Sequence, residues 1–304
     1  MTARPQSTNP LTTAPSTTPS TTPSVPARGP ATAAGPPARF RDLLAAEWLK
    51  LWSLRSLRWA FGVSALALVL LNANAAVADR NNWPHYDERI RAGFVPYGAF
   101  ADSFTNNSGI TLMLIAGSLG AITVVGEYST GLVRAGFAAV PARRSLTAAK
   151  AAVLTVVMLG YGAVVAAASF GVTQAILSGR HIGISIGYPG VLPAVLASAL
   201  LAPVSALIGL GLGALIRHAA TTIVANVVVL LLVPNFLRDD HYWSAVLYHA
   251  MPFRAWQRLR EFGPPGLGPE LPFPSTAGGS WLVLALWPLI AVLLAVVVVD
   301  RRDL

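Results

Sequence analysis

The stretch AAVLTVVMLGYGAVVAAASFGVTQAILSG, residues 151–179, contains no Asp, Glu, Lys or Arg. A helix needs about 20 mostly apolar residues to cross the hydrocarbon core of a bilayer, so this stretch is long enough to span one. One charge at the centre of such a helix costs roughly 2.5–3.5 kcal/mol on insertion scales, which explains why charges are excluded. The stretch therefore predicts a transmembrane helix.

Five further stretches are equally free of charge: residues 59–78, 103–126, 182–216, 219–237 and 271–299. Each is expected to be an α-helix, because a lipid-exposed chain must satisfy its own backbone polar groups. Trimming the windows gives expected spans at residues 57–78, 107–126, 150–177, 189–215, 220–237 and 280–299. The sequence therefore predicts an all-α integral membrane protein with six transmembrane helices.

The composition agrees with this class. The chain is 54% hydrophobic and 12% charged, whereas soluble proteins average about 25% charged residues. Cysteine is absent, which excludes disulfides, thiolate metal sites and cysteine nucleophiles. The net charge of +9 is spread between the spans without a basic run, so nucleic acid is not expected as a partner.

The distribution of positive charge predicts the orientation in the cell membrane. Arg and Lys concentrate on the cytoplasmic side of membrane proteins. If both termini are cytoplasmic, twelve Lys and Arg residues lie near the inner ends of the spans, and eight lie on the other side. Those eight are matched by eight acidic residues, and the inner segments are shorter. We therefore expect a multi-pass protein with both termini in the cytoplasm.

Residues 1–37 form a tail of Thr, Pro, Ser and Ala with nine prolines. Such a composition cannot bury a core and is typical of a disordered segment. The remaining residues, 38–304, leave no loop large enough for a separate soluble domain. We expect a disordered tail followed by one six-helix membrane domain.

Residues 39–56 have a different pattern from the tail. Apolar side chains recur at helical spacing between charged ones, and they are Phe40, Leu43, Leu44, Trp48, Leu51 and Trp52. This pattern predicts an amphipathic helix that lies in the membrane interface and leads into the first span. The plainer alternative is that the segment is the juxtamembrane end of that span.

The motifs of common enzymes argue against catalysis by this chain. A P-loop requires G-x-x-x-x-G-K-[ST], and the only lysines, Lys50 and Lys150, follow Leu and Ala. No H-E-x-x-H is present, and the acids and histidines at 239–249 match no recognised metal spacing. The chain is therefore expected to be no enzyme, and to hold neither a metal nor another cofactor.

Polar groups inside the spans are all uncharged. Ion-driven pumps normally hold ionisable residues at membrane depth, so transport driven by protons or sodium is disfavoured. Thr173, Gln174 and Asn226 are candidates for lining a pathway, or else they form hydrogen bonds between helices. Glycines at 209, 211 and 213 predict close helix packing.

The most specific segment joins the second and third spans and reads GEYSTGLVRAGFAAVPARRSLTAAK, residues 126–150. Glu127 marks the point where the second span meets the cytoplasm. Apolar residues then recur through a helix-like stretch that precedes Pro141. The pattern predicts a short cytoplasmic helix whose exposed apolar side fills a groove on a partner. The alternative is a charged turn between two helices.

These features resemble the permease subunits of ATP-binding-cassette exporters of the second type. The resemblance covers residues 39–304, and includes the aromatic outer loop before the last span and the Asp-Arg-Arg-Asp ending. Its matching positions are Glu47 and Lys50 in the N-terminal helix, and Glu127, Gly131, Leu132, Pro141, Arg143 and Lys150 in the following loop.

The resemblance implies a transport subunit that forms the translocation pathway. A separate ATPase subunit would bind ATP and Mg²⁺ and dock on the first cytoplasmic loop, and a second permease chain would complete a homodimer or heterodimer. The residues expected to couple to the ATPase are Glu127, Gly131, Leu132, Val133, Phe137, Pro141, Arg143 and Arg144. Two alternatives stay open: a non-transporting membrane anchor or sensor, and an intramembrane enzyme with polar groups converging at depth.

Overall fold

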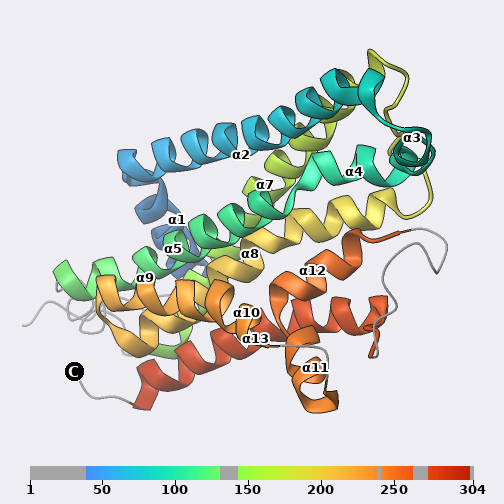
Figure 1. The fold of residues 1–304 in the computed structure, drawn as a ribbon. Helices are drawn as coiled ribbons and strands as arrows, with labels where there is room; N and C mark the ends of the chain where they lie inside the picture. Colours follow the sequence, from blue (N-terminus) through green and yellow to red (C-terminus); the bar gives the residue numbers. More distant parts are fainter. Residues whose placement is uncertain (1–38, 131–142, 238–240, 263–272, 302–304) are drawn as a thin grey trace, which may run out of the picture. The chain divides into compact units, whose positions relative to one another are not determined.

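The computed structural model describes residues 39–130, 143–237, 241–262 and 273–301 (Figure 1). They all belong to one unit, Ala38–Leu304. Within these four ranges the chain forms helices joined by short connections, and no strand occurs there. The predicted all-α class is confirmed for them. The expected disordered tail, 1–37, lies outside the described residues.

Six helices in the described ranges are long and apolar enough to cross a membrane. Three are single elements: α7 (Arg143–Ser178), α8 (Val191–Ile216) and α13 (Ala277–Arg301). The first, Arg55–His85, consists of α2 (Arg55–Asn82) and a short turn, and the second, Glu88–Ser129, consists of short helices followed by α5 (Asn106–Thr130). The remaining span consists of α9 (Ala219–Val227), the π-turn η4 (Val228–Leu232) and α10 (Val233–Phe236). Each predicted span is found. α7 begins seven residues before its predicted start, because its polar first turns continue the helix beyond the apolar stretch.

α8 forms the centre of the bundle and packs against α5, α7 and α13. Glycines make these crossings close. A Cβ on Gly120 would overlap the carbonyl oxygen of Ala206, and one on Gly162 would overlap that of Ala199. On α8 itself, a Cβ on Gly209 would meet the carbonyl oxygen of Gly117. Small residues therefore bring the backbones together, as expected where lipid supplies no hydrophobic drive between helices.

The two ends of the bundle are identified by contacts between helix termini. Arg144 Nη2 lies 2.5 Å from Asp300 Oδ2, so the start of α7 meets the end of α13. The Arg217 guanidinium lies 4.9 Å from the ring centroid of Tyr128, which joins the ends of α8 and α5. We call this the α1 end, since α1 (Phe40–Ser53) also packs there against α7.

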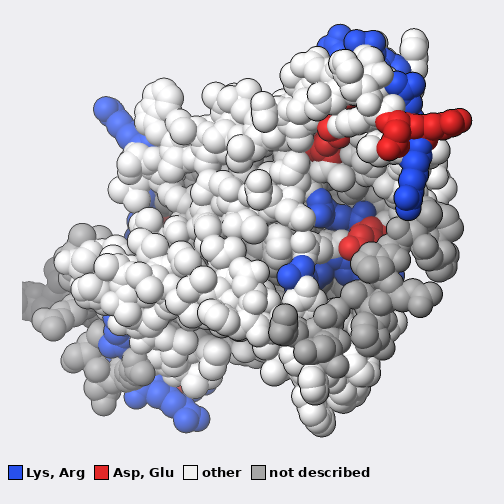
Figure 2. All heavy atoms as spheres, in the orientation of Figure 1, with Lys and Arg blue, Asp and Glu red and all other residues white. Residues whose placement is uncertain are grey.

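The opposite end, called the α3 end, carries short helices between α2 and α5. They are η1 (Trp83–His85), α3 (Glu88–Gly93), η2 (Phe94–Gly98), α4 (Ala99–Ala101) and η3 (Asp102–Phe104). The same end carries α11 (Tyr242–His249) and α12 (Pro252–Arg260) before α13. In Figure 2, Lys, Arg, Asp and Glu gather at the two ends, with a wide uncharged band between them.

α12 is seated firmly against the bundle. Trp256 is buried, and its Nε1 donates to Ser198 Oγ on α8 at 3.0 Å. The indole ring covers Gly109 of α5, where a Cβ would overlap it. The Arg260 guanidinium stacks over Trp256 and donates to Asn106 Oδ1 at 2.7 Å. Burial lowers the pKa of Arg260 to about 10.

Candidate functional site

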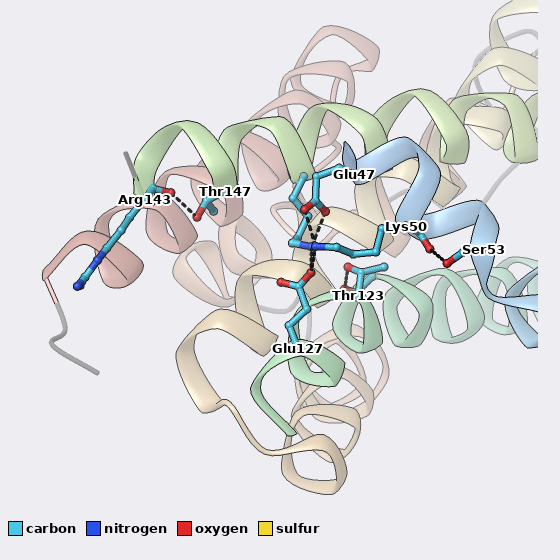
Figure 3. Close-up of polar contacts among 9 residues, drawn as sticks. Glu47, Lys50, Ser53, Thr123, Glu127, Arg143 and Thr147 are labelled. Carbon is cyan, nitrogen blue, oxygen red and sulfur yellow. Dashed lines mark hydrogen bonds and ion pairs between the residues drawn. The ribbon is translucent and has the colours of Figure 1, made fainter. Parts of the chain in front are cut away.

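Four charged side chains from three helices converge at the α1 end (Figure 3). Glu47 and Lys50 come from α1, Glu127 from the last turn of α5, and Lys150 from the beginning of α7. We call these residues the four-charge cluster. Its members are separated by up to 103 positions in the sequence.

Each ammonium group in the cluster contacts both carboxylates. Lys150 Nζ donates to Glu47 Oε2 at 2.6 Å and to Glu127 Oε1 at 2.7 Å. Lys50 Nζ donates to Glu47 Oε1 at 2.7 Å and to Glu127 Oε1 at 2.5 Å. Charges of opposite sign therefore alternate around a closed ring, which ties α1, α5 and α7 together through charge-assisted hydrogen bonds.

The ring is buried on one side and open on the other. Glu47 is 5% exposed and Lys150 8%, whereas the Lys50 side chain is 44% exposed. A buried charge without a partner is very costly, so Glu47 and Lys150 depend on one another. Lys50 lies on the solvent-exposed side of the ring and is bonded to the buried Glu47.

The pKa values of two members reflect this arrangement. Burial alone would raise the pKa of Glu47, but the charges and hydrogen bonds of Lys150 and Lys50 outweigh it and hold that pKa below 4.5. Burial alone would lower the pKa of Lys50, but Glu127 and Glu47 raise it above 10.5. Both groups are therefore charged throughout the physiological range.

Local sequence spacing explains how α1 presents its charges. Leu43, Glu47 and Leu51 are four residues apart, so they share one face of the helix, and all three are buried. The two leucines flank the carboxylate and turn it toward α7. Lys50, three residues after Glu47, shares the edge of that face. α1 ends at Ser53, because Leu54 adopts an extended conformation.

The six apolar residues predicted for α1 divide between two faces. Leu43 and Leu51 are buried and Leu44 is half-buried. Phe40, Trp48 and Trp52 are 48%, 44% and 37% exposed. The helix thus has an inner face that packs on α7 and an outer face rich in aromatic side chains. That this outer face lies in a membrane interface stays a prediction.

The structure describes only three of the eight predicted coupling residues, Glu127, Arg143 and Arg144. Gly131, Leu132, Val133, Phe137 and Pro141 lie outside the described residues. Glu127 belongs to the four-charge cluster, close to where the loop begins.

The two arginines of the predicted set lie at the other end of the loop. Arg143 begins α7, and its carbonyl accepts a hydrogen bond from Thr147 Oγ1 at 3.1 Å. Arg144 pairs with Asp300 of α13. The structure therefore joins Glu127 to α1 and Arg144 to α13, in two separate groups of charges. Their coupling role stays a prediction.

Two of the three predicted pathway residues are hydrogen-bonded within the chain. The hydroxyls of Thr173 and Ser103 lie 2.6 Å apart. Gln174 Nε2 donates to the carbonyl oxygen of Ala99 at 2.8 Å, and Gln174 Oε1 accepts from Ile184 N at 2.7 Å. These contacts hold the short helices of the α3 end against α7.

The third predicted pathway residue has a different environment. Asn226 is fully buried on α9, and neither atom of its amide has a hydrogen-bond partner. The amide lies flush against Gly117 of α5, where a Cβ would overlap it. An unpaired buried amide costs about 1–3 kcal/mol, so the Asn226 side chain destabilises this contact between α5 and α9.

Sequence motifs alone miss the cluster. Glu47, Lys50 and Lys150 enter the sequence analysis through the family resemblance, and they stand outside the predicted coupling set. A local signal does exist, since Glu47 stands between two leucines at four-residue spacing, an unusual place for a carboxylate. The partner on α7 has no comparable signal, because its contact with α1 arises only in the folded chain.

A hydrolase-like pattern also occurs in the sequence. GISIG, residues 183–187, has the G-x-S-x-G spacing of a nucleophile elbow. That motif requires a strand-to-helix turn, but these residues form the connection between α7 and α8. Ser185 Oγ accepts a hydrogen bond from the amide of Gly187 at 3.2 Å. The segment is therefore a turn without the context of a nucleophile.

Comparisons with known proteins add no assignment. No family model matches the sequence, and no curated protein is significantly similar to it. In the ranges that the structure describes, no group of three His, Cys, Asp or Glu side chains is placed to hold a metal ion.

Proposed function

We propose that this chain is the membrane-spanning permease subunit of an ATP-binding-cassette exporter, located in the cell membrane. The observation that carries the proposal is the four-charge cluster. Glu127 and Lys150 stand on the two sides of the loop expected to dock on an ATPase. Both contact the same helix, α1, through Glu47 and Lys50.

The cluster supplies a mechanical connection between that loop and the spans. A force on the loop acts at the end of α5 and the start of α7. Because each ammonium bridges both carboxylates, α1, α5 and α7 respond together. Such a joint suits a subunit that converts ATP binding on a separate chain into movement of its helices. ATP and Mg²⁺ would reside on that ATPase chain.

The proposed orientation places the α1 end in the cytoplasm, with both termini on that side. The exposed aromatic face of α1 would then lie in the inner membrane interface. Arg55 and Arg58 follow that helix directly and suit a position near anionic headgroups. A second permease chain, identical or different, would complete the transporter.

The unpaired amide of Asn226 supports a pathway along the contact of α5 and α9. In the structure this amide is buried against Gly117. Separation of the two helices would expose it to water, which would satisfy both of its polar atoms. Thr173 and Gln174 hold structural hydrogen bonds and are less suited to this role.

The proposal is tested by co-purification. The chain is co-expressed with candidate ATP-binding-cassette ATPase subunits from the same genome, and Arg143→Glu/Arg144→Glu is compared with the wild type. We expect the double variant to insert into the membrane normally and to lose the ATPase during purification. An Arg89→Glu/Arg91→Glu variant, altered at two exposed arginines of α3 at the opposite end of the bundle, serves as the charge-matched control and should keep it.

A non-transporting membrane anchor or sensor is the second candidate function. The hydrogen bonds of Thr173 and Gln174 favour it, because they assign a structural role to polar groups inside the span. This alternative predicts that no ATPase co-purifies with the wild-type chain. Retention of the ATPase by the double arginine variant would instead refute the docking assignment.

A further inference from the structure

Two arginines of α12 are connected to each other by neutral amides at the α3 end. Arg254 Nη1 donates to Gln257 Oε1 at 2.7 Å, and Gln257 Nε2 donates to Asn106 Oδ1 at 2.9 Å. Arg260 Nη2 donates to the same Asn106 oxygen at 2.7 Å. These hydrogen bonds form one continuous path between the two guanidinium groups. We call Arg254, Gln257, Asn106 and Arg260 the arginine–amide network.

The arginine–amide network contains two cations and no anion. In the ranges that the structure describes, no carboxylate oxygen lies within 4.0 Å of the Arg254 or Arg260 nitrogens. Burial lowers the pKa of Arg260 to about 10, although the charge of the neighbouring Glu261 opposes this shift. Both arginines are half-buried. A cation removed from water without a counter-charge is costly, so an anion bound from outside would stabilise the network.

The network keeps donors available for such an anion. Within the described ranges, Arg254 Nη2 and Asn106 Nδ2 donate no hydrogen bond, and neither atom is buried. The Arg260 guanidinium is fixed beside them, because Nη1 donates to the Phe104 carbonyl oxygen and Cζ lies 4.2 Å from the ring centroid of Trp256. Several N–H groups on a preorganised guanidinium suit the oxygens of a phosphate group.

The third arginine of α12 has a different role. Arg258 Nε donates to the carbonyl oxygen of Ser275 at 3.0 Å, and its Nη1 donates to that of Glu261 at 3.2 Å. These bonds hold the end of α12 to the backbone that follows it. In Figure 2, Lys and Arg atoms reach the surface where Figure 1 places α12. The network is therefore separate from the bonds that anchor the end of the helix.

The neighbouring helix α11 indicates that the anion belongs to a lipid. α11 packs against α12, and Arg254 Cζ lies 4.2 Å from the ring centroid of Tyr248. One face of α11 carries four large apolar side chains that are between 44% and 76% exposed: Tyr242, Trp243, Val246 and Leu247. Trp and Tyr concentrate at the headgroup level of membranes. An exposed apolar surface therefore adjoins the cationic network.

We propose that the arginine–amide network binds the phosphate group of an anionic phospholipid, whose acyl chains lie beside the exposed apolar face of α11. The phosphate oxygens accept hydrogen bonds from Arg254 Nη2 and Asn106 Nδ2, and the charge of Arg260 attracts them. The lipid supplies the negative charge that the network lacks, and it holds α12 against the start of α5. This role requires only a membrane, so it is independent of the proposed exporter function.

Asn106→Asp tests the proposal without loss of the hydrogen bonds that hold α12. The aspartate keeps an oxygen for Gln257 and Arg260, gives the network its own negative charge and removes the Nδ2 donor. Native mass spectrometry counts the phosphatidylglycerol molecules bound to the full-length chain in detergent micelles. We expect Asn106→Asp to bind this lipid at least about tenfold more weakly than the wild type, the scale of one lost charge-assisted hydrogen bond. In lipid-free micelles its unfolding midpoint should be no lower than that of the wild type.

Asn107→Asp is the matched control, because it adds the same charge at the next residue, which is also exposed. It should bind phosphatidylglycerol as the wild type does, whereas Arg254→Gln should weaken binding as Asn106→Asp does. Equal binding by the wild type and Asn106→Asp would overturn the proposal, and so would equal weakening by Asn107→Asp, which would indicate general surface charge. Glycerol 3-phosphate that binds as tightly as the lipid would overturn the lipid assignment and indicate a free phosphate ester.

Discussion

Replacing Lys150 by methionine removes the charge that the buried side of the four-charge cluster depends on. Methionine has a similar length, so the space beneath α1 stays filled. Glu47, which is 5% exposed, then keeps only Lys50 as a partner. We expect Lys150→Met to destabilise the docking of α1 more than any exposed charge change would.

The magnitude follows from the geometry. Lys150 Nζ and Glu47 Oε2 are 2.6 Å apart, and unit charges at that distance attract by about 6 kcal/mol at an effective dielectric constant of about 20. Desolvation of the two ions offsets much of this in the wild type. The variant loses the attraction but keeps the desolvation cost of Glu47. Removing one partner of a buried pair typically costs about 3–5 kcal/mol, which is the loss expected here.

A double-mutant cycle distinguishes this cause from lost packing. Lys150→Met, Glu47→Leu and the double variant are compared by denaturant titration of the purified chain in detergent micelles. The double variant leaves Lys50 and Glu127 to pair with one another, 2.5 Å apart. It should therefore be more stable than Lys150→Met alone, since a buried ion pair can be replaced by apolar side chains at little cost.

The exposed pair Arg144–Asp300 provides the control. Its side chains are 72% and 32% exposed, so Arg144→Gln should leave the unfolding midpoint unchanged. The reasoning is refuted if the Lys150→Met and Glu47→Leu losses simply add in the double variant. Additivity would mean that the two side chains act independently, despite their contact.

Two further predictions concern pH and packing. Because the pKa of Glu47 is lowered, its contribution is complete above its ordinary value of 4.5 and is lost as pH falls through the lowered value. The pKa of Lys50 is raised, so its contribution is complete below 10.5 and is lost as pH rises through the raised value. The difference in unfolding midpoint between the wild type and Glu47→Gln should therefore be level between those limits, and a difference that changes near pH 7 would contradict the assignment. Gly162→Ala should cost about 1–3 kcal/mol or more, because the new Cβ overlaps the Ala199 carbonyl. Gly160→Ala, two residues earlier with open space around it, should be neutral or slightly stabilising in the same titration.

The spans could be predicted because each one is a local property. Charge exclusion over about 20 residues decides whether a helix can enter lipid, and no distant residue is needed for that decision. The same holds for α1, whose apolar spacing is visible in fourteen consecutive residues. Predicted boundaries differ mainly where a polar turn continues a helix beyond the lipid, as at the start of α7.

The candidate site could be predicted only in part. Glu127 stands out because it follows directly on a charge-free stretch, so the end of the second span marks it. Thr173 and Gln174 were recognisable as polar groups within a span. Their hydrogen bonds to Ser103 and Ala99 were not, because the short helices of the α3 end carry no strong pattern.

The amino-acid sequence alone therefore determined that the described chain is helical, where its six long apolar helices lie, and which of their ends carry charge. Hydrophobic length and charge exclusion act over neighbouring residues, so they can be read without coordinates. Only the tertiary structure decided that Glu47 and Lys50 meet Glu127 and Lys150. Such contacts depend on how glycine-lined helices cross, and that geometry arises when distant segments pack together.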